Sequence, residues 1–163
     1  MKTSFEIAAP GEREIVVSRD FDASAEAVFD AMTKPEILQK WYGLEGWTLK
    51  VCEIDLKTGG AWRFVADLPN GKTFGQYGVY REIERGRKLV NTENWEEWHA
   101  GETLVTTNFE ETGGITTLRS TSLFSTAEVR DLILTTGIAE NIGQLYQNLE
   151  NCLRNENPEK NNG

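Results

Sequence analysis

The side chains best suited to metal or nucleophilic chemistry are few and widely separated. His99 is the single histidine, and the two cysteines, Cys52 and Cys152, lie far apart in the sequence. A structural zinc site needs four Cys or His ligands, usually as closely spaced pairs, and the sequence has no such pair. We therefore expect no metal and no cofactor, and we interpret His99, near a predicted hairpin end, as a surface residue.

Three ionisable side chains in predicted strands, Arg63, Tyr77 and Glu93, are the remaining candidates for acid–base chemistry. To act together they would need to face one interior in which burial displaces a pKa. The sequence contains no nucleophile elbow, no dinucleotide-binding glycine motif and no Walker motif. We therefore expect a non-catalytic protein and retain an enzyme that uses these three residues as the alternative.

The elements that must position these side chains follow the order strand, two short helices, six strands, long helix. The first strand is predicted at 13–21, and capping residues Ser24 and Thr33 begin the two short helices. Turns rich in Gly separate the later strands, which are predicted at 48–57, 60–68, 72–84, 87–96, 102–111 and 114–124. Apolar spacings of three and four predict a helix from about 125 to 154 that bends or begins anew near Gly137.

This order predicts an α+β helix-grip fold. A curved antiparallel sheet of about seven strands wraps around the long C-terminal helix, and two short helices lie between strands one and two. We expect residues 1–12 to be an N-terminal lead and 13–153 to be a single domain. The polar segment 154–163 lacks an apolar anchor and is expected to be a disordered tail.

A ligand cavity is predicted between the sheet and the last helix. Trp62 and Phe64 alternate along the strand at 60–68 and are expected to point inward. The last two strands alternate Thr and Ser side chains, which suits a cavity wall, with ordinary half-exposed strands as the alternative. Both faces of the strand at 72–84 carry aromatic residues, so its register stays open. The expected ligand-binding residues are Trp41, Trp62, Phe64, Tyr77, Trp95, Phe109, Ile138 and Ile142.

Two glycines in the last predicted helix, Gly137 and Gly143, allow two interpretations. Missing side chains could leave space above the sheet for a ligand. Equally, they could mark a kink or close packing of the helix.

Charge and composition exclude several classes of protein. The chain has 163 residues with 17 Lys+Arg and 26 Asp+Glu, a net charge of -9, which disfavours nucleic acid and anionic lipid as partners. No apolar run approaches the length of a membrane span, so we expect no membrane insertion. The N-terminal residues lack a signal-peptide pattern and the cysteines are predicted to be free thiols, so we expect a cytoplasmic protein that is a monomer or weak homodimer.

Four stretches of the sequence resemble the START-like (SRPBCC, birch-pollen-allergen) superfamily. They are 21–43, where a strand leads into two helices that end in Trp41; 55–64, a Gly-Gly hairpin before an aromatic strand; 78–93, the next hairpin; and 126–153, an Arg-Asp helix start and long helix. Within the superfamily, the chain is most similar to two groups. One is related to the C-terminal domain of the activator of the ninety-kilodalton heat-shock chaperone's ATPase, and the other comprises the calicheamicin self-resistance proteins.

The resemblance implies the helix-grip fold and, most broadly, a cavity that binds an apolar small molecule. We therefore expect non-catalytic binding of a hydrophobic or aromatic ligand between sheet and helix. The superfamily also includes polyketide cyclases and cochaperone domains, and a shared fold does not choose among these activities. A cyclase- or dehydratase-like enzyme and a stimulator of a heat-shock chaperone ATPase are therefore the alternatives.

Overall fold

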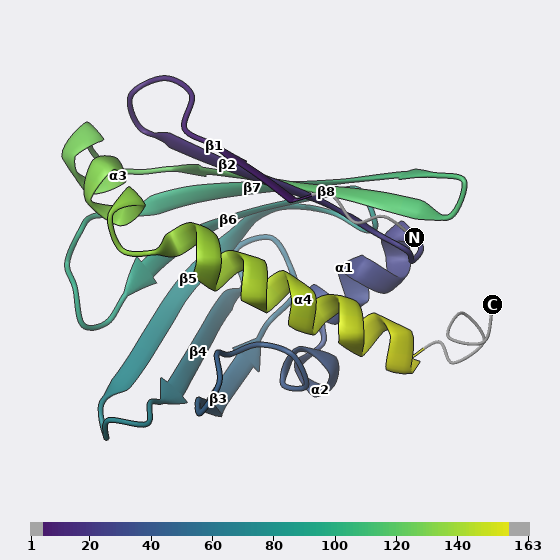
Figure 1. The fold of residues 1–163 in the computed structure, drawn as a ribbon, viewed down its shortest axis with the longest axis horizontal. Helices are drawn as coiled ribbons and strands as arrows, with labels where there is room; N and C mark the ends of the chain where they lie inside the picture. Colours follow the sequence, from purple (N-terminus) through teal and green to yellow (C-terminus); the bar gives the residue numbers. More distant parts are fainter. Residues whose placement is uncertain (1–4, 157–163) are drawn as a thin grey trace.

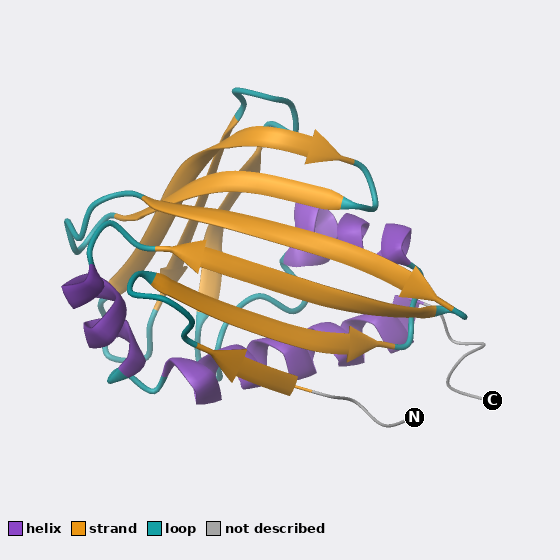
Figure 2. Cartoon of the chain, turned by 90° about the horizontal axis from the view of Figure 1, so that it is seen from above, coloured by secondary structure: helices purple, strands orange, loops and turns teal. Residues whose placement is uncertain are grey.

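One antiparallel sheet of eight strands organises the part of the chain, residues 5–156, that the computed structural model describes. The strand order is β1-β2-β8-β7-β6-β5-β4-β3, and the sheet curves around the long helix α4 (Figure 1, Figure 2). The strands are β1 (Phe5–Ala8), β2 (Glu14–Phe21), β3 (Thr48–Ile54), β4 (Ala61–Asp67), β5 (Thr73–Glu84), β6 (Lys88–Trp95), β7 (Thr103–Thr112) and β8 (Ile115–Leu123). The predicted helix-grip fold is confirmed.

The helices are α1 (Ala25–Thr33), α2 (Pro35–Leu38), α3 (Ala127–Leu134) and α4 (Ile138–Glu156). The hydroxyl of Ser24 accepts a hydrogen bond from the Ala27 amide at 3.1 Å and caps α1. Capping explains the start of α1 but not of α2: the predicted Thr33 cap is wrong, because the N-cap residue is Lys34 and the Thr33 hydroxyl donates to the Phe29 carbonyl at 2.8 Å instead. Gly137 has a φ of 77°, a left-handed conformation that ends α3 before α4 begins, so the predicted break near Gly137 is confirmed.

The sheet has one strand more than expected. Strand β1 pairs with β2, placing Phe5 opposite Arg19 and Ile7 opposite Val17. Four residues with two large apolar side chains give too short an alternation for the strand to be predicted from the sequence. The strand is stabilised by its pairing with β2 and not by its own local pattern. At the other end, α4 continues to Glu156, and the rest of the expected tail lies outside the described residues.

The core lies between the inner face of the sheet and the helices. Phe21, Phe29, Leu118 and Leu149 are fully buried there. The ring of Tyr146 on α4 meets the Phe21 ring edge-on, with centroids 5.8 Å apart. Burial of such side chains is the main stabilising contribution to the fold.

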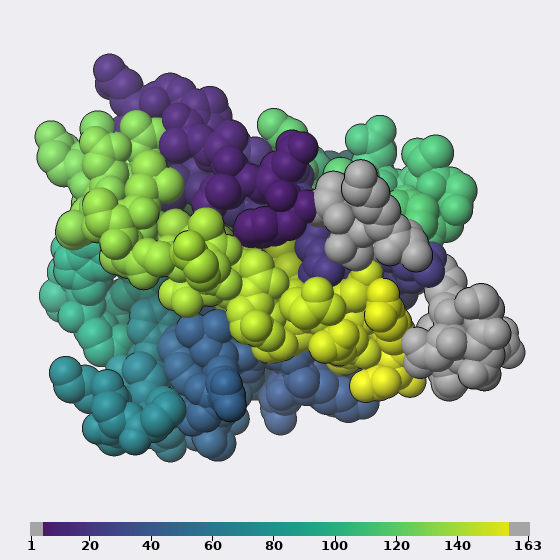
Figure 3. Space-filling view, in the orientation of Figure 1, coloured from purple at the N-terminus to yellow at the C-terminus, as the bar shows by residue number. Residues whose placement is uncertain are grey.

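Helix α4 crosses the sheet at a distance that its side chains bridge. Its backbone approaches α1 and α3 more extensively than it approaches any described strand. In Figure 3 its side chains lie between the N-terminal strands and the segment that follows α2. Asn148 fixes this second contact by donating hydrogen bonds to the carbonyls of Trp41 and Gly43, at 3.4 and 3.0 Å. Within residues 5–156, every helix is too short or too polar to cross a lipid bilayer.

Candidate functional site

The register of the central strands decides which side chains face α4. Phe64 on β4 pairs with Gln76 on β5, and Gln76 pairs with Trp95 on β6. Residues two positions apart on a strand share a face, so Glu93 lies on the same face as Trp95. Trp62 and Phe64 belong to this inner face, as the alternation at 60–68 predicted, because both contribute to the core beneath the helices.

A bulge explains why the register of β5 could not be read from the sequence. Pairing shifts between Tyr80, which faces Asn91, and Glu82, which faces Val90. The extra residue turns the strand by one position, so Ile83 points to the same face as Tyr80.

The inner face carries a mixed aromatic and polar group, which we call the inner site: Tyr42, Phe64, Gln76, Glu93 and Trp95. All five side chains are half-buried. The Tyr42 hydroxyl donates a hydrogen bond to the Gln76 side-chain oxygen, and the Tyr42 and Phe64 rings are 5.3 Å apart. The inner site therefore combines apolar ring surface with polar side chains.

Glu93 is the electrostatic centre of the inner site. Among the described residues its carboxylate forms no hydrogen bond and no ion pair. Burial raises the pKa of Glu93 to about 7. Burial is also the main cause that raises the pKa of Tyr42, and the negative charge of Glu93 is the second. Burial also raises the pKa values of Cys52 and Tyr80. Tyr42, Cys52 and Tyr80 are therefore neutral at neutral pH, while Glu93 titrates there.

The expected ligand-binding residues fall into separate places. Phe64 and Trp95 belong to the inner site, and Ile138 and Ile142 lie half-buried on α4, packed against the core. Trp62 is buried over Gly78, where its indole donates to the Thr92 carbonyl at 3.2 Å.

Two of the remaining expected residues are committed to the core. Trp41 donates its indole N–H to the Ala31 carbonyl at 2.9 Å, and Phe109 packs edge-on against Phe29 with centroids 5.5 Å apart. Both are buried and present little surface to a ligand.

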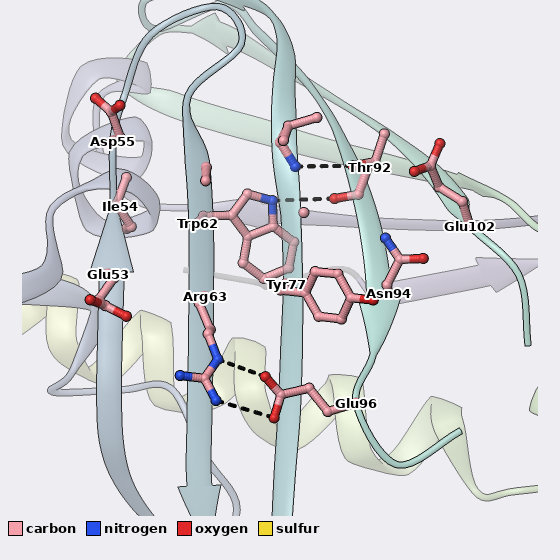
Figure 4. A pocket seen from close by; sticks show the side chains of 13 residues that line it. Glu53, Ile54, Asp55, Trp62, Arg63, Tyr77, Thr92, Asn94, Glu96 and Glu102 are labelled. Carbon is pink, nitrogen blue, oxygen red and sulfur yellow. Dashed lines mark hydrogen bonds and ion pairs between the residues drawn. The ribbon is translucent and has the colours of Figure 1, made fainter. Parts of the chain in front are cut away.

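Tyr77 points away from the others, into a groove on the outer face of the sheet. It pairs with Arg63 and Asn94, which share that face, and it is 41% exposed. The groove has a volume of about 830 Å³, and Figure 4 shows Arg63 bound to Glu96 on its floor. Their Nε and Oε1 atoms are 2.6 Å apart. Further acidic side chains line it: Glu53, Asp55 and Glu102.

This arrangement separates the three residues considered for acid–base chemistry. Arg63 and Tyr77 line the outer groove, whereas Glu93 belongs to the inner site. Sequence reasoning missed Tyr42 and Gln76. The sequence signal for Gln76 is that it alternates with Phe74 and Gly78 along β5, on the face whose partners on β4 include Trp62 and Phe64. Tyr42 has no such signal, because it follows α2 in a segment without periodicity.

The comparisons with known proteins identify the family and the fold. The family model described as "Activator of Hsp90 ATPase homolog 1-like protein" matches residues 22–154. A solved structure from Rhodobacter sphaeroides has a TM-score of 0.85 and 28% identity, covering 91% of this chain and 97% of its own. A Nitrosomonas europaea protein has a TM-score of 0.81 and 23% identity, covering 91% and 98%.

A more distant solved structure shows the same fold. CalU16 from Micromonospora echinospora has a TM-score of 0.64 and 19% identity, covering 96% of this chain and 88% of its own. No curated protein matches the chain.

Proposed function

Because this chain belongs to the family of Activator of Hsp90 ATPase homolog 1-like proteins, with the START-like fold, we propose that it binds a hydrophobic or aromatic small molecule between its sheet and α4. The inner site carries this proposal. Its aromatic rings stay half-buried on the face toward a helix whose backbone keeps away from the strands. Side chains that only fill a core would be buried.

The proposed contacts supply both affinity and orientation. Phe64 and Trp95 would provide ring surface from the sheet, with Ile138 and Ile142 opposite on α4. Apolar burial contributes about 25 cal/mol per Å², so roughly 300 Å² of buried ligand surface gives about 7 kcal/mol before the costs of association.

The proposal is tested by blocking the inner face from the helix side. Ile142→Trp adds bulk on α4 toward the core, whereas the matched variant Leu132→Trp adds the same bulk on α3, where Leu132 is 52% exposed. Calorimetric titration with neutral aromatic probes, including indole and 2-naphthylmethanol, should give saturable binding to the native chain and Leu132→Trp. Ile142→Trp should lose it. No binding of any probe to the native chain, or equal binding to both variants, contradicts the proposal.

A cyclase- or dehydratase-like enzyme acting on a polyketide is the second candidate. Glu93 favours it, because a carboxyl group that titrates near neutral pH can transfer protons. The separation of Arg63 and Tyr77 from Glu93 leaves such an enzyme with a single titrating group on the inner site. Loss of water from a linear poly-β-ketone thioester, followed by mass spectrometry with native chain and Glu93→Gln, decides between the candidates. Loss that depends on Glu93 supports the enzyme.

Stimulation of a chaperone ATPase is the third candidate and rests on the family description and the outer face. Tyr77 is exposed there, beside the acidic groove. ATPase assays of the host's heat-shock chaperone should show no stimulation if ligand binding is the whole function. We place the protein in the cytoplasm because Cys52 and Cys152 are free thiols.

A further inference from the structure

The charges on the inner face of the sheet are divided between two ends. Glu93 pairs with Thr103 at one end of β7. Arg19 on β2 pairs with Leu118 on β8, and Leu118 in turn pairs with Phe109, near the other end of β7. Thr103 and Phe109 are six residues apart, a separation of about 20 Å along a strand. The basic side chain Arg19 is therefore too far from Glu93 to neutralise it.

Within residues 5–156, no charged side chain of either sign acts on Glu93. Tyr42 approaches from the segment after α2, Tyr80 lies on the neighbouring strand β5, and both are neutral at neutral pH. Thr103 faces it from β7, and the half-buried apolar residues Ile138 and Ile142 lie on α4. A carboxylate in such a place loses hydration without gaining a partner, which is unfavourable in the absence of a bound cation.

We propose that the molecule bound at the inner site carries a protonated amine, which pairs with the Glu93 carboxylate while its apolar body packs against Phe64 and Trp95. This inference rests on the proposed function and names the class of its ligand. Two independent features converge on a cation. The unpaired carboxylate supplies the opposite charge, and the faces of aromatic rings attract ammonium groups electrostatically.

The same features argue against other ligand classes. A carboxylate- or phosphate-bearing ligand would meet Glu93 as a like charge and find no basic partner among residues 5–156 on this half of the inner face. A purely apolar ligand would bury the carboxylate further without compensating it. An aromatic or alkyl amine satisfies both the rings and the charge.

Two probes of nearly equal shape test the inference, 2-naphthylmethylamine and 2-naphthylmethanol. Dissociation constants are measured by calorimetry at pH 8, where Glu93 is ionised and a primary amine is protonated. The native chain should bind the amine on the order of tenfold more tightly than the alcohol, because close charge pairs couple strongly when partly buried. Glu93→Gln should bind both probes equally, with the affinity for the alcohol unchanged. Glu110→Gln, an exposed position on β7, should keep the preference.

The native chain provides a second measurement that does not depend on a variant folding. At pH 6 most Glu93 is protonated while the amine keeps its charge, so the preference for the amine should shrink. Equal affinity for both probes at pH 8, with binding still blocked by Ile142→Trp, overturns the inference and leaves the proposed function standing. Failure of both probes to bind overturns both.

Discussion

At the scale of single residues, Glu93 shows how a position in the fold changes a side chain's chemistry. Burial raises its pKa from an ordinary value of 4.5 to about 7, so the folded chain holds a proton that the unfolded chain releases between these values. Stability therefore falls as pH rises from about 4.5 to about 7, and it stays lower above that range.

Glu93→Gln removes this titration and should be more stable than the native chain at pH 8. We expect a difference of about 1–3 kcal/mol, since one pKa unit corresponds to about 1.4 kcal/mol and the side chain is partly exposed. Urea unfolding at pH 8 and pH 4.5 measures it, and the advantage should vanish at the lower pH. A pH-independent difference between the two chains would show that Glu93 is not titrating as described.

Gly78 is a second residue with a definite structural role. A Cβ added there would lie 1.9 Å from the Thr92 carbonyl oxygen and 2.9 Å from the Trp62 indole nitrogen. The absent side chain thus makes room for the hydrogen bond between Trp62 and Thr92.

Gly78→Ala should displace the Trp62 indole, break this hydrogen bond and destabilise the chain by about 2–4 kcal/mol. Urea unfolding gives the free energy, and the tryptophan emission spectrum reports the displaced indole. A loss below about 0.5 kcal/mol, the usual range for a surface substitution, would mean that the strands adjust without cost.

At this scale the sequence predicts some side chains better than others. Phe64 was placed inward correctly because its strand alternates cleanly between large apolar and charged residues. The direction of Tyr77 depends on register in a strand with aromatic residues on both faces and a bulge at its centre. The pKa of Glu93 depends on burial by segments distant in the chain, which no local pattern records.

At the scale of elements, Gly137 and Gly143 differ in what they do, although both interrupt the same apolar pattern. Gly137 adopts a φ of 77° between α3 and α4, which a side chain would strain. Gly143 lies inside α4, and a Cβ there would meet only the Phe5 ring, at 3.8 Å. Its missing side chain therefore opens toward β1.

The two glycines form a matched pair for substitution. Gly137→Ala should destabilise the chain by about 1 kcal/mol, because alanine disfavours the left-handed conformation. Gly143→Ala should stabilise it by up to about 1 kcal/mol, because alanine is the better helix former and the added methyl makes an ordinary contact. Thermal unfolding of both variants checks the opposite signs. Destabilisation of equal size in both would show that Gly143 has a packing role instead.

The order of elements follows from the sequence because long strands and Gly-containing turns alternate so regularly. The exceptions are the short pieces. Strand β1 has four residues, too few to show a period, and α2 ends at Leu38 although Trp41 and Tyr42 follow at helical spacing. Both depend on tertiary contacts, namely pairing with β2 and the hydrogen bonds that Asn148 donates to the segment after α2.

At the scale of the whole molecule, the sheet and its covering helix are joined through buried charges. Arg19 on β2 and Glu150 on α4 are 4% and 1% exposed, and the Glu150 charge acts on Arg19. The Arg19 Nη1 and both Glu150 carboxylate oxygens have no hydrogen-bond partner among the described residues. The Arg19 guanidinium lies 5.0 Å from the centroid of the Phe21 ring, and Arg154 reaches Glu150 from the surface at 3.9 Å.

Two buried opposite charges of this kind depend on one another more than they stabilise the fold. Arg19→Met alone leaves the Glu150 carboxylate buried opposite a neutral side chain, and Glu150→Leu alone leaves the Arg19 guanidinium buried opposite a neutral side chain. Each single change should destabilise the chain by about 3–5 kcal/mol. The double variant removes both charges and fills the space with apolar atoms, so it should cost less than either single change. A double-mutant cycle by urea unfolding measures this coupling between the two layers. Additive losses would mean that sheet and helix are held by apolar packing alone, with the two charges acting independently.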